Sequence, residues 1–387
     1  MRRVLHLTTH VNIGGITSYI KLITKEMGKM PYRFFVGSSG GTQEKLLGAQ
    51  GVETLRLNIR TKSELSPKVY QAVRPLVKFI REEKIDLIHA HTRVTQVLSW
   101  LVQRLSGIPY VSTCHGFYKR RLGRRLLPAW GDHVIAISKP VEGALTHSFR
   151  VPPEKVSTIF NAIDIDDLIA RYQEKDARAI RKRLNIPPAS RVIGIVARIV
   201  RDKGHEYFLR ALKKLITSSH PDIKILIVGE GPYLRAIQAL VQELKLENSA
   251  CFMGNLEDIT YALAVIDVFV LPAIWREGFG LAIIEAMAVR IPVVVTNIWS
   301  LNELVQDRVN GLLVEPKNVD DLKEAVHELL TDQHLYETVS ARGSDMVTRE
   351  FSISKMAERV DHLYGRVLAA SRRGKSVSQV KTIMKSA

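Results

Sequence analysis

Short apolar runs alternate with longer amphipathic stretches along most of this chain. Branched side chains are frequent in the runs, which is typical of strands buried on both faces of a sheet. Helical patterns lie between the runs, the clearest at Ser66–Glu83. The first half therefore predicts strands at Arg3–Thr8, Tyr32–Val36, Glu53–Leu57, Ile85–His91, Tyr110–Thr113 and Val134–Ile137.

The alternation restarts after a polar stretch at Asp164–Ser190. Strands are expected there at Val192–Ala197, Ile223–Val228, Ala250–Met253, Val268–Leu271, Val293–Thr296 and Leu312–Val314. Such alternation implies parallel sheets covered by helices, so the sequence predicts an α/β fold of two doubly wound, Rossmann-like domains. Ligands bind such sheets at the carboxyl ends of the strands. We expect the turns at those ends to face one interdomain cleft; they carry Gly14-Gly15, His115, Arg198, Gly229-Glu230-Gly231 and Glu277-Gly278.

A glycine-rich turn joins the apolar run Asp267–Pro272 to a helical run at Leu281–Ala288. Backbone N–H groups at such a turn lie at the positive end of the helix dipole, so the turn predicts a phosphate site. Glu277 precedes the turn, and Glu285 is expected about two turns into the helix among apolar neighbours. A buried carboxylate requires a partner, and the two hydroxyl groups of a ribose would supply one.

This turn resembles the Glu-x7-Glu motif of the retaining glycosyltransferases of family four, which have the GT-B fold. Further segments match the same family in order, so that the resemblance covers residues 1–370. These segments are Gly14-Gly15, Asp86–His91, His115-Gly116, Asn161–Asp164, Ile193–Gly204, Ile225–Pro232, Phe252–Gly254 and Asn310–Val314.

The resemblance implies a nucleotide-sugar donor, no further cofactor and no bound metal. Arg198 and Lys203 would clamp the donor diphosphate in place of a metal. Glu277 would contact the donor sugar, and Glu285 would contact the ribose. The implied catalytic residues are His115, Glu277, Arg198 and Lys203. The implied donor-binding residues are Gly14, Gly15, Arg198, Lys203, Gly229, Glu230, Gly278, Phe279, Gly280, Leu281 and Glu285.

Several of these residues also have a structural interpretation: Glu285 could lie on a solvated helix face, and Gly14-Gly15 could form a simple tight turn. The two cations would then be surface charges, Glu277 would favour the start of the helix electrostatically, and His115 would be a core histidine. A metal site is a separate question, because His89 and His91 alternate on one predicted strand and share a face. No third ligand accompanies them in the sequence, so we interpret this pair as structural.

The chain departs from the family pattern near the nucleotide. Trp299-Ser300 replaces the usual glycine pair of a loop that faces the nucleotide, although the acidic residue of that loop persists as Glu303. Arg290 stands where a glycine commonly ends the helix. These departures leave the preference for base and sugar open. The sequence also does not identify the acceptor, the linkage or the oligomeric state.

The composition is that of a globular protein large enough for two domains, with 387 residues of which 46% are hydrophobic and 25% charged. The N-terminal apolar stretch is too short for a signal peptide, no run suits a membrane helix, and two cysteines far apart suit a reducing cytoplasm. We expect a cytoplasmic protein with an acceptor-side domain at 1–163, a donor-binding domain at 164–351, a helix returning to the first domain at 352–371 and a disordered basic tail at 372–387.

The formal net charge of +17 changes the expected partners. Gly116–Trp130 and Ser371–Ala387 each carry five cations and no acid, and such segments attract anionic lipid headgroups or nucleic acid. Lys119–Trp130 would form a helix with basic faces and an apolar stripe, which suits a peripheral position on the inner face of the cytoplasmic membrane. The alternative is an ordinary amphipathic helix packed on its own domain.

Together these features predict a retaining, metal-independent hexosyl- or related transferase. It would move a sugar to a glycan or lipid-linked acceptor, as in lipopolysaccharide or exopolysaccharide assembly of the bacterial envelope. One alternative is a GT-B nucleotide-sugar epimerase or hydrolase, which product analysis without acceptor would distinguish. The other is a basic nucleic-acid-binding protein, which explains the charge but not two glycine-turn domains. We expect no nucleic-acid partner.

Overall fold

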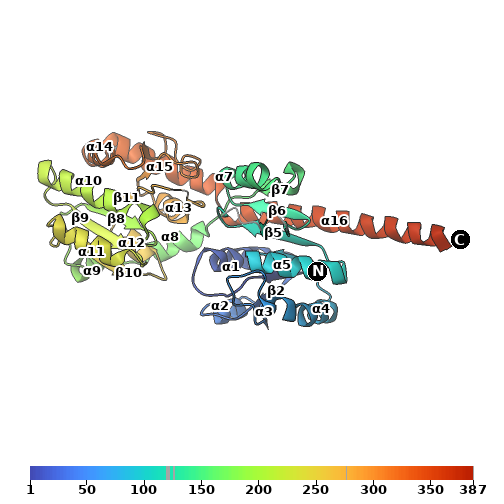
Figure 1. Ribbon diagram of the computed structural model, residues 1–387. Helices are drawn as coiled ribbons and strands as arrows, with labels where there is room; N and C mark the ends of the chain where they lie inside the picture. The colour runs from blue at the N-terminus through green and yellow to red at the C-terminus, as the bar shows by residue number, and fades with distance from the viewer. Residues whose placement is uncertain (119–122, 125–126, 276, 387) are drawn as a thin grey trace. The chain divides into compact units, whose positions relative to one another are not determined.

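A computed structural model of the chain describes residues 1–118, 123–124, 127–275 and 277–386, with side chains up to residue 373. The chain forms two compact units, Met1–Asn161 with Ile353–Ala387 and Ala162–Ser352. Each unit contains one parallel sheet flanked by helices, with seven strands in the first and six in the second (Figure 1). The prediction of two Rossmann-like α/β domains is confirmed.

The sheet of the first unit has the strand order β3-β2-β1-β4-β5-β6-β7. Its strands are β1 (Arg2–Leu7), β2 (Tyr32–Ser38), β3 (Glu53–Arg56), β4 (Leu87–Ala90), β5 (Tyr110–Cys114), β6 (His133–Ala136) and β7 (Val156–Thr158). Its helices are α1 (Gly15–Met27), α2 (Glu44–Ala49), α3 (Pro67–Gln71), α4 (Val73–Glu82), α5 (Arg93–Ser106), α7 (Lys139–Gly143) and α16 (Ile353–Ser386). A π-helical turn at Ala144–Ser148 and a 3-10 turn at Pro153–Lys155 complete it.

Two helices stand where the sequence predicted one at Ser66–Glu83. The break lies at Ala72, between α3 and α4. Pro75 lies three residues into α4. Its ring has no N–H to donate and would clash with the carbonyl of Gln71, the last residue of α3, in a continuous helix.

Alternation along β1 separates two faces of the first sheet. Leu5 and Leu7 lie in an apolar cluster with side chains of α3, α4 and α5. His6, between them, points to the other face. Tyr364 of α16 lies on that face as well, with its ring centroid 6.2 Å from that of Tyr32. Helix α16 packs against α1 and is held at that face by Asp361, which accepts from Arg2 (N···O 2.9 Å).

Helix α16 continues to Ser386, whereas the sequence predicted a disordered tail from residue 372. The tail contains no proline, and its lysine, glutamine and methionine residues have favourable helix propensities. Without a proline the helix continues through Gly374, although glycine is a poor helix former.

The sheet of the second unit has the strand order β10-β9-β8-β11-β12-β13. Its strands are β8 (Val192–Val196), β9 (Lys224–Val228), β10 (Ala250–Gly254), β11 (Val268–Leu271), β12 (Val293–Thr296) and β13 (Leu312–Val314). Its helices are α8 (Ile165–Gln173), α9 (Ala177–Arg183), α10 (His205–Ser218), α11 (Leu234–Glu243), α12 (Thr260–Leu263), α13 (Leu281–Ala288), α14 (Val319–Thr331) and α15 (Gln333–Glu350), with a 3-10 turn at Arg201–Lys203.

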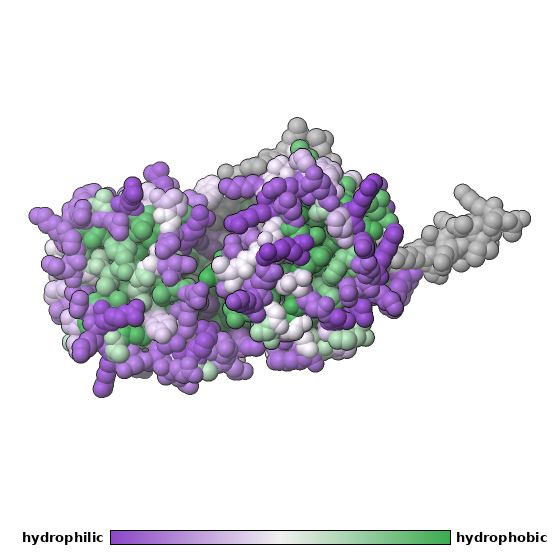
Figure 2. All heavy atoms as spheres, turned by 90° about the horizontal axis from the view of Figure 1, so that it is seen from below, coloured by the Kyte–Doolittle hydropathy of each residue, from purple (hydrophilic) through white to green (hydrophobic). Residues whose placement is uncertain are grey.

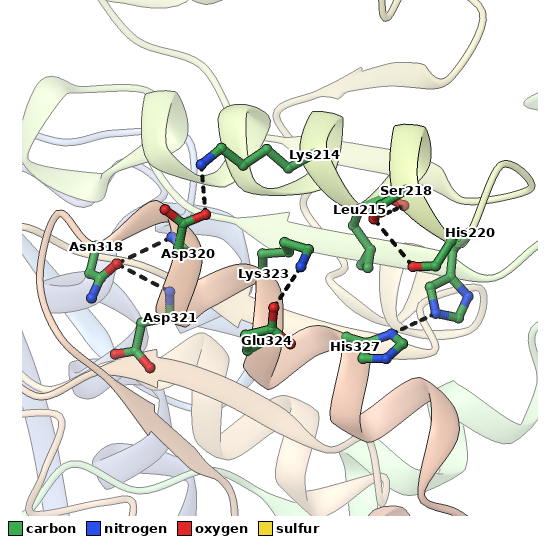
Figure 3. A network of polar contacts seen from close by, with 11 residues as sticks. Lys214, Leu215, Ser218, His220, Asn318, Asp320, Asp321, Lys323, Glu324 and His327 are labelled. Atoms are coloured by element: carbon green, nitrogen blue, oxygen red, sulfur yellow. Dashed lines mark hydrogen bonds and ion pairs between the residues drawn. The ribbon is translucent and has the colours of Figure 1, made fainter.

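Polar contacts join α10 and α14 at the surface of the second unit (Figure 3). Lys214 Nζ lies 2.6 Å from Asp320 Oδ1, and His220 Nε2 lies 2.9 Å from His327 Nδ1. Asn318 caps α14 by accepting from the Asp320 N–H (N···O 3.2 Å). An exposed ion pair contributes about 0–1 kcal/mol and the cap about 1 kcal/mol, so these contacts orient helices whose burial supplies most of the stability.

Hydrophilic side chains are spread over the face seen in Figure 2, with smaller apolar areas between them. Among the described residues, every helix is too short or too polar to span a lipid bilayer.

Candidate functional site

The order of strands reverses next to β8 in the second sheet. From β8 the chain adds β9 and β10 on one side, and it then returns to add β11, β12 and β13 on the other. The strand pairs are parallel, so the turns that follow β8 and β11 leave the same edge of the sheet and diverge. Such a switch point opens a crevice in which α/β proteins bind ligands.

Backbone hydrogen bonds join the turns at this edge. The N–H of Ile199, next to Arg198, donates to the carbonyl of Glu230 after β9 (N···O 2.9 Å). The N–H of Ile274, after β11, donates to the carbonyl of Asp202 (N···O 2.9 Å). The predicted residues that follow β8, β9 and β11 are thereby brought together on one fixed backbone.

Gly204 allows the turn after β8 to pack against β11. Its φ is +74°, and a Cβ there would lie 1.8 Å from the carbonyl oxygen of Pro272. A side chain would therefore require both an unfavourable backbone conformation and a displaced strand end. This close approach fixes the backbone of Lys203, the preceding residue.

Lys203 and Glu277 form an ion pair across the switch point. Their side chains are 22% and 14% exposed, so water screens the pair only in part. The second carboxylate oxygen of Glu277 accepts from the Gly278 N–H (N···O 2.9 Å), and the Ser300 hydroxyl donates to the Glu277 carbonyl (O···O 2.5 Å). Arg198, in the same turn after β8, is exposed.

The glycine turn after Glu277 ends at the start of α13. Gly280 caps the helix with φ +96°, and Phe279 before it is buried. The first N–H groups of a helix have no acceptor within it. The Ile283 N–H donates to the Gly280 carbonyl (N···O 3.0 Å), which leaves the N–H groups of Leu281 and Ala282 for an anion. Helix α13 has the predicted bounds, and Glu285 is its fifth residue, so it lies about one helical turn in; the expected two turns were wrong.

Glu285 is half-buried where α13 packs against α8. Burial raises the pKa of Glu285 to about 7, and the nearby Arg171 guanidinium of α8 opposes that rise. Arg171 is itself held by Asp167 (N···O 2.9 Å) and by Asp258. The sequence did not identify Arg171 as a neighbour of the site; the only local signal is its i,i+4 spacing from Asp167.

The first unit carries the remaining predicted residues. Gly14 caps α1 and Gly15 is its first residue, and no atom lies within 4 Å of a Cβ built at either position. His115 follows β5 and is half-buried, with its Nε2 3.0 Å from His91 Nδ1. The ring of Tyr19, from α1, meets the His115 ring edge-on at 5.1 Å between centroids.

The sequence model described as Glycosyltransferase Family 4 matches residues 13–167, and the one described as Glycosyl transferases group 1 matches residues 176–346. Over 74% of this chain and 78% of the relative, the chain is 32% identical to a GDP-mannose-dependent monoacylated alpha-(1-6)-phosphatidylinositol monomannoside mannosyltransferase of Corynebacterium glutamicum. The chain belongs to glycosyltransferase family 4.

Two further relatives agree with this assignment. The family 4 chain is 29% identical, over 75% of its length and 77% of the relative, to the UDP-Gal:alpha-D-GlcNAc-diphosphoundecaprenol alpha-1,3-galactosyltransferase of Escherichia coli. Its structure superposes on a glycosyltransferase from Rickettsia africae with a TM-score of 0.84 and 21% identity, covering 95% of this chain and 98% of that one. The predicted GT-B fold is therefore confirmed.

The glycosyltransferase also contains a buried histidine cluster that the sequence predicted only in part. His6 of β1 supplies the third member beside His89 and His91, and potential ligand atoms of the three lie within 4.8 Å of one another. His89, however, already has hydroxyl partners on both nitrogens, Tyr364 and Thr113, each at 2.6 Å. The available signal in the sequence was a histidine inside the apolar run of β1, between Leu5 and Leu7.

The basic segment of the first unit is described only in part. Lys119, Arg120, Arg121, Leu122, Arg125 and Leu126 lie outside the described residues. The Arg124 guanidinium lies 3.7 Å from the centre of the Tyr118 ring, and Trp130 is buried. These two residues pack on their own unit, which is the alternative that the sequence left open.

The buried histidines predict a loss of stability in acid. Burial lowers the pKa of His6 and His115 to about 3 and that of His133 and His205 to about 4. Below pH 6.5 the unfolded chain takes up protons that the folded enzyme does not, so each such histidine costs about 1.4 kcal/mol per pH unit. We expect the free energy of unfolding in urea to fall steeply from pH 6.5 to pH 5.

A matched pair of variants checks the source of that slope. His205→Gln should reduce the slope of the free energy of unfolding against pH by about 1.4 kcal/mol per pH unit, which corresponds to one proton. Replacement of the exposed His334 by Gln should leave the slope unchanged. A free energy of unfolding that stays constant between pH 7.5 and pH 5 would contradict the neutral, buried state of these side chains.

Proposed function

We propose that this enzyme transfers a sugar from a nucleotide sugar, with retention of anomeric configuration and without a metal ion, to a lipid-linked or other envelope glycan. The observation that carries the proposal is the Lys203–Glu277 ion pair at the switch point, directly before the N-terminus of α13. One cation, one carboxylate and a row of helix N–H groups are the groups that a sugar diphosphate requires.

The diphosphate would bind between the two cations and the start of α13. Phosphate oxygens would replace Glu277 as the partner of Lys203, and Arg198 would add a second positive charge from the exposed side of the turn. The N–H groups of Leu281 and Ala282 would contribute the partial charge of the helix dipole. These groups stabilise the negative charge that develops on the departing diphosphate.

The sugar and the ribose would each meet one of the two glutamates. Release of Lys203 to the phosphate leaves the Glu277 carboxylate able to accept hydrogen bonds from sugar hydroxyl groups. Glu285 would accept from the ribose, and Arg171 beside it favours the charged form that such a contact needs. We also propose that His115, Gly14 and Gly15 of the first unit contact the donor.

The relatives support an acceptor that carries a lipid. By their names, the Escherichia coli enzyme acts on a diphosphoundecaprenol-linked sugar and the Corynebacterium glutamicum enzyme on a phosphatidylinositol mannoside. The same names give UDP-Gal for one donor and GDP-mannose for the other. The proposal therefore includes a lipid-linked acceptor and leaves the base open between uridine and guanosine.

Donor binding should weaken when any one of its charged contacts is removed. A thermal-shift comparison of UDP and GDP sugars selects the donor, and calorimetry then measures its affinity for Glu285→Gln, Arg198→Ala and Lys203→Ala. Each loss should cost about 1.5–3 kcal/mol, which is about 10- to 150-fold in Kd. Arg178→Ala, which removes an exposed cation of α9, is the control and should bind like the parent. Three variants with unchanged affinity would show that the donor binds elsewhere.

Sugar transfer should continue in excess chelator, because the cations and the helix N–H groups supply the charge that a metal supplies in other transferases. The rate with EDTA should equal the rate with added magnesium or manganese. Activity that chelator abolishes and either ion restores would refute this part of the proposal.

We further propose a peripheral contact with anionic lipid. Its support is the net charge of +17 and the exposed Arg372 and Arg373 on α16. Since Arg124 and Trp130 pack on their own unit, they are not part of this surface.

Co-sedimentation with vesicles tests the membrane contact. Each cation near an anionic surface contributes about 1 kcal/mol, so binding should require anionic lipid and decrease as salt is raised. Arg372→Glu with Arg373→Glu should weaken it further. Equal binding to neutral vesicles, or no binding to anionic vesicles at low salt, would exclude the contact.

A further inference from the structure

Three histidines of the first unit form a hydrogen-bonded row that ends at His115. His6 Nδ1 lies 2.9 Å from His91 Nε2, and His91 Nδ1 lies 3.0 Å from His115 Nε2. We call His6, His91 and His115 the histidine row. His6 and His91 are 0% and 1% exposed, and His115 is half-buried. The row therefore runs from the interior of the sheet to the one member that lies nearer the surface.

Each bond in the row needs one donor and one acceptor. Burial lowers the pKa of all three side chains well below the ordinary value, so the rings are neutral at pH 7. A neutral imidazole carries one N–H and one bare nitrogen. Both bonds must then point the same way, which leaves two arrangements: all three rings protonated on Nε2, or all three on Nδ1.

The inner end of the row distinguishes the two arrangements. His6 Nε2 is buried and has no hydrogen-bond partner among the described residues. Protonation on Nε2 would leave an N–H there without an acceptor, which is the rarer defect in protein interiors. Protonation on Nδ1 leaves only a bare nitrogen without a donor.

We propose that His6 and His91 are positioning residues that fix His115 in the neutral Nδ1–H form, so that it donates a hydrogen bond to the donor substrate. In this form Nε2 of His115 accepts from His91, and Nδ1 carries the proton. His115 then acts as a donor to a sugar hydroxyl or a phosphate oxygen and not as a general base. The inference rests on the proposed place of His115 beside the nucleotide sugar.

A metal ion held by His6, His89 and His91 is the competing interpretation. Two nitrogens bound to one tetrahedral zinc, at about 2.0–2.1 Å each, would lie farther apart than the 2.9 Å between His6 and His91. The two rings are also within 13° of parallel, a geometry that an N–H···N bond allows. His89 is occupied by the hydroxyl groups of Tyr364 and Thr113. The distances are those of hydrogen bonds.

Nitrogen-15 NMR of the full chain, labelled in histidine at pH 7.5, reads the tautomer without any variant or substrate. His115 should carry its proton on Nδ1 and have a bare Nε2. His91→Asn retains an amide N–H near the position of Nδ1 and should preserve that form. His91→Leu removes the donor, and His115 should change to the Nε2–H form that histidine prefers in water.

Turnover of the nucleotide sugar that stabilises the protein most provides the second measurement. His91→Leu should lower kcat at least tenfold with little change in KM, and His91→Asn should recover most of the loss. His89→Leu is the control, since it removes a buried ring of the same cluster outside the row and should leave the tautomer unchanged.

An Nε2-protonated or charged His115 in the parent, or one zinc bound per chain, would overturn the proposal. So would a His91→Leu variant that changes the tautomer but not kcat, because His115 would then not act on the donor. Absence of sugar transfer from every nucleotide sugar, with the expected tautomer in the parent, would instead refute the proposed function and leave the row intact.

Discussion

The reversal of strand order next to β8 is the constraint on which the donor site depends. Parallel strands end at one edge of the sheet, and the reversal makes the turns after β8 and β11 diverge there. Lys203 follows the first strand and Glu277 the second, so their ion pair spans the divergence. Gly204 then fixes the distance between the turn after β8 and the end of β11, since no larger residue fits against the Pro272 carbonyl. The placement of charge in this glycosyltransferase is thus set by topology before any side chain is considered.

Burial gives the titratable groups of both units forms that they would not have in water. Burial raises the pKa of Glu285 to about 7, and the Arg171 guanidinium limits that rise in favour of the charged form. The histidine row is held neutral by the same cause, and its hydrogen bonds then admit only two proton arrangements. A carboxylate that accepts and an imidazole that donates are complementary to the hydroxyl and phosphate groups of a nucleotide sugar.

The sequence predicted most of the sheet strands, because parallel strands buried on both faces are nearly continuous apolar runs. It missed β7 (Val156–Thr158), which has three residues and two hydroxyl side chains. The contacts that it missed are long-range: neither His6 with His91 nor Arg171 with Glu285 has a periodic signal. Local chemistry was more informative at Arg290, where the family commonly has glycine. Its φ of +59° shows that the left-handed end of α13 is retained, at a cost of about 1–2 kcal/mol.

The most direct test of the account is a crystal structure of the enzyme with the nucleoside diphosphate that stabilises it most. Phosphate oxygens should lie at Arg198, Lys203 and the first N–H groups of α13, with the ribose on Glu285 and with Glu277 released from Lys203. A diphosphate bound away from the carboxyl ends of β8 and β11, with the Lys203–Glu277 pair intact, would contradict it.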